Sequence, residues 1–276
     1  MIGQKNLIKN INKLFSEEVT PHFTHFILLS GDRGSGRKLV ASTVAQKLNG
    51  HSIKCGISAE ELRNVVDLIN RTTDRIVVII PDADMMSVSA KNVLLKITEE
   101  TPENAVFIMS VEDEYSMPDT IRSRATLLRM DAYSPDELYE FARSKSEYLT
   151  PEELDIIVNI CRTPGEVLNL INFGVIEFWE YTNKVLDNID KVSTANSFKV
   201  AKKVALKTDS EGYDLKLFWR AFMMLCTEHM TFDMDYRVKY AKWVMMTSKY
   251  MQMLRTKGAN LQMIFDSWIV DIRGIK

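Results

Sequence analysis

The sequence predicts an α/β domain with a five-stranded parallel sheet, followed by regions that are entirely helical. Two observations carry this prediction. Short apolar runs alternate with helical patterns through the first half of the chain, which is typical of a parallel sheet covered by helices on both faces. From Ser134 onward the apolar spacing is helical only. We therefore expect three parts: an α/β domain over residues 1–131, a small helical domain over 132–174 and a helical domain over 175–276.

Five short apolar runs are the predicted strands. An unbroken β-branched run at 76–80 is typical of a central strand buried on both faces. The other four runs cover 26–29, 52–55, 105–109 and 126–130. The spacing between the runs predicts one helix over 37–48 and another through 91–96, which Pro102 stops because proline cannot continue a helical ladder.

Three helix starts in the second half share one construction. Each has Ser or Thr, then proline, then a glutamate three residues after the first: Ser134–Glu137, Thr150–Glu153 and Thr163–Glu166. This is a capping box with proline at the first helical position. The last of these helices runs into Gly174, so residues 132–174 are predicted to form a small bundle.

The C-terminal part is rich in bulky apolar residues. It holds all four tryptophans, which are Trp179, Trp219, Trp243 and Trp268. At helical spacing such residues indicate a core or a subunit interface more readily than the lining of a cofactor pocket.

Composition excludes several classes of protein. With 276 residues, 46% of them hydrophobic and 26% charged, the chain can bury more than one core. A net charge of −2 gives no global positive field of the kind that a stand-alone nucleic-acid binder has. The sequence has no long apolar run, so we expect no membrane span and a cytoplasmic protein. Three cysteines without a Cys-x-x-Cys pair argue against a disulfide framework and a structural zinc site.

A glycine-rich loop follows the first strand and opens a helix, which is the context of a phosphate-binding P-loop. Its glycines are Gly31, Gly34 and Gly36. A working P-loop continues with lysine, which reaches the β- and γ-phosphates, and with Ser or Thr, which holds Mg²⁺. This chain has Arg37 and Lys38 there. Arginine is a planar fork, and lysine cannot ligate a cation, so we expect impaired phosphoryl transfer unless Lys38 swings in as a substitute.

The end of the third predicted strand carries a second loss. A P-loop ATPase normally ends that strand with an aspartate that orients Mg²⁺ and a glutamate that activates water. Here Pro81 stands at the magnesium position, and Asp82, one methylene shorter than glutamate, stands at the base position. The candidate site is thus a degenerate nucleotide site made of Gly31, Gly34, Gly36, Arg37, Lys38 and Asp82, with no metal.

Further segments join this loop in a familiar pattern. They are Ile2-Gly3-Gln4, His25, Pro81-Asp82-Ala83-Asp84, Asn92–Lys96, Glu99–Asn104 and Thr120–Arg124. Together these residues resemble the bacterial clamp-loader branch of the AAA+ ATPases, and within it the delta-prime family of the DNA polymerase III clamp loader. The resemblance is dense over residues 1–131 and rests on helical content alone over 175–276.

The resemblance implies a division of labour. Family members of this type are catalytically inactive and act as stators, while partner subunits bind and hydrolyse ATP with Mg²⁺, so no cofactor is expected in this chain. Expected partners are the other clamp-loader subunits in a hetero-oligomeric ring, with the sliding clamp and primer-template DNA reached through the assembled complex. Residues 132–174 are then the lid and residues 175–276 the collar.

The resemblance also gives Arg124 a role. A Ser-Arg-Cys motif in the family places an arginine finger in a neighbour's ATP site, and here the motif reads Ser123-Arg124-Ala125. Taken alone, an arginine in Arg122-Ser123-Arg124 is more often a solvated surface residue, and the finger role comes from the resemblance. Two departures agree with an inactive site. In Ser110-Val111-Glu112, Val111 stands at the position of a polar sensing residue, in an alignment that can shift by one residue. Gly165 stands where the lid carries a sensing arginine, and the alternative is a tolerated second residue of a helix. The zinc module of bacterial relatives is absent after Asn49, which is consistent with a divergent or phage-encoded member.

Two rival functions remain open. One is a slow ATPase that uses Lys38 and Asp82 in a non-standard P-loop. The other is an AAA-like scaffold in a different assembly, such as a DNA repair or partitioning complex.

Overall fold

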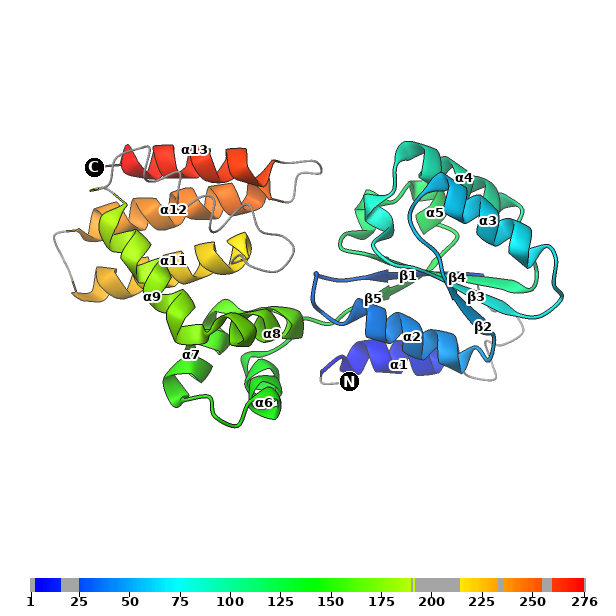
Figure 1. Cartoon of the computed structure of the whole chain (residues 1–276), viewed down its shortest axis with the longest axis horizontal. Helices are drawn as coiled ribbons and strands as arrows, with labels where there is room; N and C mark the ends of the chain where they lie inside the picture. The colour runs from blue at the N-terminus through cyan, green and yellow to red at the C-terminus, as the bar shows by residue number, and fades with distance from the viewer. Residues whose placement is uncertain are drawn as a thin grey trace. The chain divides into compact units, whose positions relative to one another are not determined.

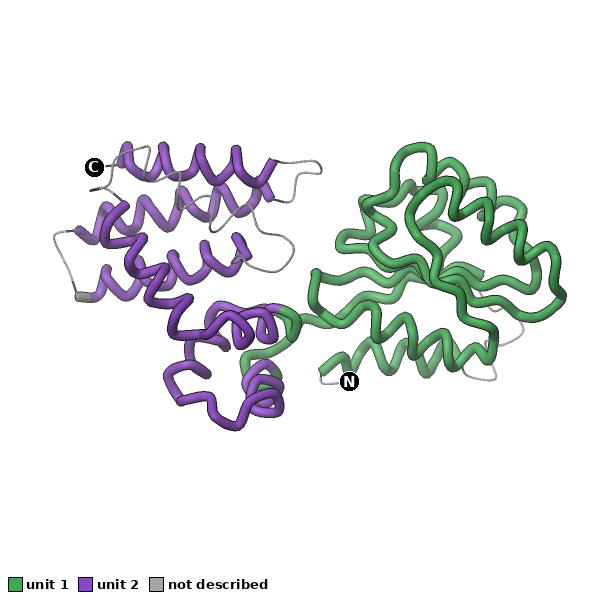
Figure 2. Tube along the Cα trace, in the orientation of Figure 1, with its two compact units in different colours: residues 1–137, 163–165 green, residues 138–162, 166–276 purple. Residues whose placement is uncertain are grey.

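The computed structural model describes residues 3–15, 25–189, 191, 214–232, 236–254 and 260–275. These residues form two compact units (Figure 2). The first comprises 1–137 with 163–165, and the second comprises 138–162 with 166–276. The sequence predicts three domains, with boundaries after residues 131 and 174, whereas the structure divides into two compact units. The three-domain division stays a prediction. Ile2 of the Ile2-Gly3-Gln4 segment lies outside the described residues.

The first unit contains the predicted five-stranded parallel sheet. Its strands are β1 (Phe26–Ser30), β2 (His51–Lys54), β3 (Ile76–Ile80), β4 (Ala105–Val111) and β5 (Thr126–Arg129). The strand order is β2-β3-β4-β1-β5, so β1 lies between β4 and β5. All five apolar runs were therefore assigned correctly to strands, with ends shifted by one or two residues.

Helices cover both faces of this sheet (Figure 1). One face packs on α1 (Lys5–Leu14) and α2 (Arg37–Lys47), and the other on α3 (Ala59–Ile69), α4 (Val88–Glu99) and α5 (Asp119–Arg122). Short 3₁₀ turns, η2 (Ala83–Met85) and η3 (Glu114–Ser116), follow β3 and β4. Sequence reasoning did not predict α1, α3 or α5. For α3 the signal was present, because Ser58 and Glu61 form a capping box at its start.

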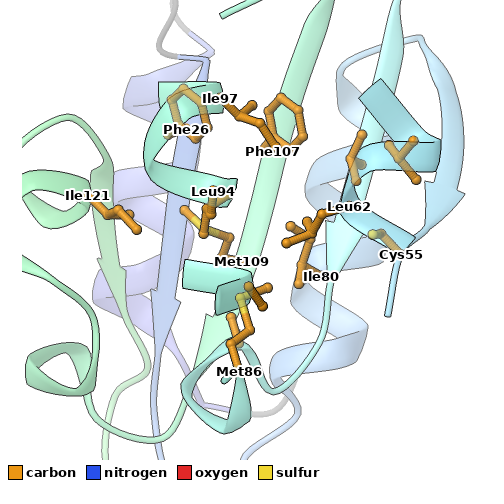
Figure 3. Packing of buried hydrophobic residues seen from close by; sticks show 14 of the residues in the cluster. Phe26, Cys55, Leu62, Ile80, Met86, Leu94, Ile97, Phe107, Met109 and Ile121 are labelled. Carbon is orange, nitrogen blue, oxygen red and sulfur yellow. The ribbon is translucent and has the colours of Figure 1, made fainter. Parts of the chain in front are cut away.

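The core on the α3–α4 side is made of apolar side chains and includes a pair of stacked aromatic rings (Figure 3). Phe26 of β1 and Phe107 of β4 stack with ring centroids 5.2 Å apart, and the two residues are paired in the sheet. Successive residues of a strand face opposite sides, so Ile27 and Ile108 join the core under α1 and α2 instead. This buried sheet fixes the positions of its carboxyl-end loops.

The second unit is helical. Its helices are α6 (Pro135–Lys145), α7 (Pro151–Ile160), α8 (Pro164–Phe173), α9 (Val175–Asn188), α11 (Leu215–Phe232), α12 (Arg237–Met253) and α13 (Leu261–Arg273). The first residues of α6 and α8 belong to the first unit. The α6 and α7 starts have the expected capping geometry, with reciprocal bonds between Ser134 and Glu137 and between Thr150 and Glu153.

Three of the four tryptophans form the centre of this unit. Trp219, Trp243 and Trp268 are fully buried, as expected for core residues. The indole N–H of Trp243 donates to the Ile272 carbonyl, and that of Trp268 donates to the Thr247 hydroxyl. These bonds fix the packing of α12 on α13.

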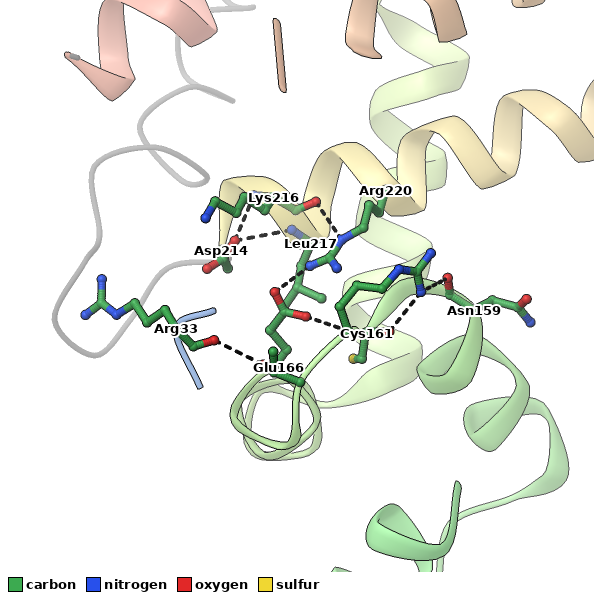
Figure 4. Close-up of polar contacts among 10 residues, drawn as sticks. Arg33, Asn159, Cys161, Glu166, Asp214, Lys216, Leu217 and Arg220 are labelled. Carbon is green, nitrogen blue, oxygen red and sulfur yellow. Dashed lines mark hydrogen bonds and ion pairs between the residues drawn. The ribbon is translucent and has the colours of Figure 1, made fainter. Parts of the chain in front are cut away.

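A buried ion pair ties α8 to α11 within the second unit (Figure 4). The Arg220 guanidinium lies 2.6 Å from Glu166, and both side chains are nearly inaccessible to solvent. Glu166 also accepts the backbone N–H of Arg162. Cys161, next to this group, is buried, and burial raises the pKa of its thiol to about 12. No described helix of either unit is long and apolar enough to cross a membrane.

Candidate functional site: the glycine-rich loop

The glycine-rich loop lies between the end of β1 and the start of α2, as the sequence predicts. Gly34 and Gly36 have φ angles of 84° and 96°, which only glycine adopts without strain. Gly31 is required for space, because a Cβ there would lie 2.4 Å from Cγ of Met130. The three glycines thus shape the loop between β1 and α2.

Arg37 stands at the lysine position, and its side chain is 6% exposed. One of its terminal nitrogens lies 3.3 Å from Asp82 and 3.9 Å from Glu112. The other, Nη1, is buried without a hydrogen-bond partner. The guanidinium charge is therefore compensated by carboxylates of the chain itself instead of facing an open phosphate cradle.

Asp82 lies in the turn after β3 and receives a second cation. Lys38 Nζ is 3.5 Å from its other carboxylate oxygen, and the Lys38 side chain is 69% exposed. The Asp82 backbone has a φ of 52°, in the left-handed region, and its N–H donates to the Ser110 hydroxyl. These bonds hold the carboxylate at the mouth of the loop.

A depression of about 350 Å³ lies beside the loop, between α2, the edge strand β2 and its neighbour β3. Its lining includes Lys38, Lys54, Pro81 and Ser110. The lining contains two lysines and no carboxylate, and hard cations such as Mg²⁺ require oxygen ligands. Among the described residues, no group of three or more His, Cys, Asp or Glu side chains has the arrangement of a metal site.

The structure gives the two sensing positions a plain structural role. Val111 is fully buried in the core on the α3–α4 side, and the polar side chain at this end of β4 is that of Ser110. Gly165 lies against the phosphate loop, where its backbone N–H donates to the Gly34 carbonyl. Sequence reasoning missed Ser110, Glu112 and Tyr133, whose hydroxyl donates to the Ser35 carbonyl.

Arg124 lies in a different part of the first unit, after α5. It is exposed, and its guanidinium donates to the Thr120 carbonyl at 2.9 Å. Among the described residues, no carboxylate lies within ion-pair distance of it. Its neighbour Ala125, at the cysteine position, packs against the core.

Arg122, two residues earlier, differs from Arg124 because neighbouring side chains engage its guanidinium. Its guanidinium lies over the Tyr115 ring, 4.6 Å from the centroid, and pairs with Asp119. All three residues, Tyr115, Asp119 and Arg122, belong to the segment between β4 and β5 that also carries Arg124. Of the two arginines in this described segment, Arg124 is the one with no carboxylate within ion-pair distance.

A bidentate ion pair joins η3, near the start of this segment, to β5, which follows it. Nε and Nη2 of Arg129 donate to the two carboxylate oxygens of Glu114 at 2.8 and 2.6 Å. These bonds hold the pKa of Glu114 below its usual value, against the opposing effect of burial. Ile121 of α5 is fully buried and anchors the middle of the segment.

Comparisons with known proteins agree with this fold. A family model described as DNA polymerase III, delta subunit, matches residues 57–134. The DNA polymerase III subunit gamma of Buchnera aphidicola is 30% identical over 174 residues, which are 52% of this chain and 47% of the relative. The subunit tau of Bacillus subtilis is 27% identical over 155 residues, covering 45% of this chain and 27% of the relative.

A Replication factor C small subunit from Haloarcula marismortui is 23% identical over 175 residues, covering 57% of this chain and 53% of the relative. The chain spans about half the length of the first curated relatives it matches. These similarities support a relationship to the clamp-loader AAA+ proteins.

Solved structures show the same fold. A DNA polymerase III gamma subunit-related protein from Thermotoga maritima superposes with a TM-score of 0.52 at 16% identity, over 99% of both chains. The RuvB Holliday junction branch migration motor of Thermotoga maritima gives 0.53 at 18% identity, over 78% of this chain and 87% of that chain. The chain therefore has an AAA+ P-loop α/β fold followed by a helical region.

Proposed function

We propose that this relative of the clamp-loader AAA+ proteins is a delta-prime-type subunit of a DNA sliding-clamp loader in DNA replication. In this role the chain is catalytically inactive and stator-like, and it supplies Arg124 to the ATP site of a neighbouring subunit. ATP and Mg²⁺ are bound by the partner subunits.

The internal pairing of Arg37 is the observation that carries the proposal. A phosphate-binding loop needs a positive charge that is free to meet the phosphates. Arg37 is buried at that position and held by Asp82 and Glu112. Asp82, at the water-activating position, therefore neutralises the charge of Arg37, at the lysine position. Neither side chain is then available for catalysis.

The surroundings of Arg124 support the second half of the proposal. An arginine finger must reach out of its own subunit with its charge uncompensated, because it stabilises negative charge on a γ-phosphate held elsewhere. Arg124 is exposed, and its one described guanidinium bond is to a backbone carbonyl. Arg122 is engaged by Tyr115 and Asp119, which makes it the weaker candidate.

The proposed assembly is a hetero-oligomeric ring in the cytoplasm. Residues 132–174 act as the lid and residues 175–276 join the collar with the other clamp-loader subunits. The sliding clamp and primer-template DNA are met through the assembled ring, since a net charge of −2 gives this chain little affinity of its own for DNA.

Two measurements test the proposal. The chain, tagged and recovered from its own cell, should bring down polymerase III ATPase subunits and a sliding clamp; recovery with repair or partitioning proteins instead would favour the scaffold alternative. The purified chain should hydrolyse no ATP. Because Lys38 is exposed beside Asp82, a Mg²⁺-dependent turnover of ~1 s⁻¹ that disappears in Lys38→Ala would establish the slow-ATPase alternative.

A further inference from the structure

Three consecutive carbonyl groups of the phosphate loop accept hydrogen bonds from residues that lie far along the chain. The Thr163 hydroxyl donates to Arg33, which is the dashed bond that ends on the Arg33 carbonyl in Figure 4. The Gly165 N–H donates to Gly34 at 2.9 Å, and the Tyr133 hydroxyl donates to Ser35 at 2.7 Å. We name these three donors the carbonyl latch. All of its residues belong to the first unit.

The latch brings two backbones together with no side chain between them. A Cβ on Gly165 would lie 2.5 Å from the Gly34 Cα, and a Cβ on Gly34 would lie 2.7 Å from the Thr163 hydroxyl oxygen. Contacts that short do not occur, so both positions require glycine. Position 165 therefore requires glycine because its backbone approaches the loop closely. This structural requirement is separate from the missing sensing arginine.

The Gly165 amide would ordinarily have no partner. Pro164 is the first residue of α8, and the N–H groups of a first helical turn have no acceptor within the helix. Here the N–H group of the second helical residue, Gly165, donates to the Gly34 carbonyl of the loop. Burial raises the pKa of the Tyr133 phenol above its ordinary value, so its hydroxyl keeps the proton that it donates.

A loop with three glycines loses much conformational entropy when it becomes ordered. In a phosphate-binding loop, bound phosphate offsets this loss through the backbone N–H groups. In this chain the same loop is bonded through its carbonyl groups by residues of the chain itself. We propose that the carbonyl latch is a built-in intramolecular ligand, which keeps the phosphate loop ordered without any nucleotide. This inference stands independently of the clamp-loader role.

Amide hydrogen exchange of the full chain, resolved at single residues by NMR, tests the latch. The Gly165 amide should be protected in the free protein, and addition of ATP with Mg²⁺ should not change its rate. Glu152 occupies the corresponding second position of α7 and serves as the internal reference. Its amide should exchange faster than that of Gly165 after correction for intrinsic rates.

Two conservative variants should release the latch. Thr163→Val and Tyr133→Phe each remove one hydroxyl donor, and each should speed Gly165 exchange roughly five- to tenfold while exchange in β4 stays unchanged. The matched controls are Thr101→Val, whose hydroxyl bonds the Ile97 carbonyl away from the loop, and Tyr139→Phe on the exposed side of α6. The controls should leave Gly165 exchange as in the wild type.

Either of two results would overturn the latch. One is unprotected Gly165 in the free wild-type chain, or protection that appears only with ATP and Mg²⁺. The other is equal Gly165 exchange in the wild type, Thr163→Val and Tyr133→Phe. Because the test uses the isolated chain, its failure would leave the role of Arg124 untouched, and loss of that role would leave the latch standing.

Discussion

The guanidinium of Arg37 lies 3.3 Å from the Asp82 carboxylate, and the sequence predicts these two residues at the lysine and water-activating positions of a P-loop ATPase. The two side chains form an internal ion pair. Its cation is buried, while Asp82 is 43% exposed.

Asp82→Asn should destabilise the chain through charge alone. Asparagine keeps the shape of the side chain and tolerates the left-handed backbone at this position, so Arg37 simply loses its nearest counter-charge. We expect the free energy of unfolding to fall by about 1–3 kcal/mol, measured by urea denaturation at constant m. Glu112→Gln, at 3.9 Å, should cost less. Equal stability of Asp82→Asn and the wild type would show that Arg37 does not depend on this pair.

Arg124→Ala should leave assembly intact and lower clamp-dependent ATP turnover by the reconstituted loader. Arginine fingers contribute about 10³–10⁵ to the rate at one site, but a ring with several sites loses only one of them, so total turnover should fall in part. Arg124→Lys keeps the charge without the planar fork, and a defect as large as that of alanine would show that geometry matters.

Arg122→Ala is the matched control for this experiment. It removes the contact with the Tyr115 ring and the pair with Asp119, so its effect should be on stability, with less effect on turnover. Wild-type loading by the Arg124→Ala complex would refute the finger role, and failure to assemble would indicate a structural role for Arg124 instead.

Gly165→Ala should lower stability, although glycine-to-alanine changes in helices usually do the opposite. Alanine at an unstrained helical position stabilises by about 0.4–1 kcal/mol. At Gly165 its Cβ would meet the Gly34 Cα at 2.5 Å, which forces the two backbones apart. The melting temperature should drop, whereas Gly274→Ala, at a C-terminal glycine with a negative φ of −73°, should change it little. An unchanged or raised melting temperature for Gly165→Ala would mean that the contact relaxes freely.

Glu114→Gln should reduce stability near neutral pH and have little effect in acid. The folded-state pKa of Glu114 is lowered, so its ion pair with Arg129 contributes above the unfolded-state pKa and is lost as the pH falls through the folded-state value. Because Arg129 is largely exposed, we expect about 1 kcal/mol at pH 7. Unfolding free energies of the wild type and Glu114→Gln should converge as the pH falls below the folded-state pKa of Glu114. A difference that does not vary with pH would assign the effect to packing.

Sequence reasoning succeeded where local pattern and burial coincide. The run at 76–80 is apolar on both faces because β3 lies inside the sheet, and capping boxes at Ser134 and Thr150 begin helices where expected. Helix α1 was missed although its buried residues, Leu7, Ile11 and Leu14, follow a helical period.

The site was harder to predict because its contacts are tertiary. The sequence indicated that Arg37, Lys38 and Asp82 replace catalytic residues, but it did not indicate that they pair with each other. The reason for a glycine at position 165 cannot be read from the sequence either, because strands β2 to β5 separate Gly34 from Gly165 along the chain. From the sequence alone, a glycine in the first turn of a helix could be either a tolerated residue or a required one. The contact with Gly34 shows that Gly165 is required.

The position of β1 in the sheet has a consequence for synthesis of the chain. Phe26 pairs with Phe107 and Ile27 pairs with Thr126, so the strand that the ribosome makes first waits for both of its neighbours until β4 and β5 have emerged. Until then its apolar residues are uncovered on a growing nascent chain, and such long-range parallel pairing is slow. We expect ribosome-bound chains that end before Thr126 to bind chaperones, and release of these chains once β5 has left the exit tunnel.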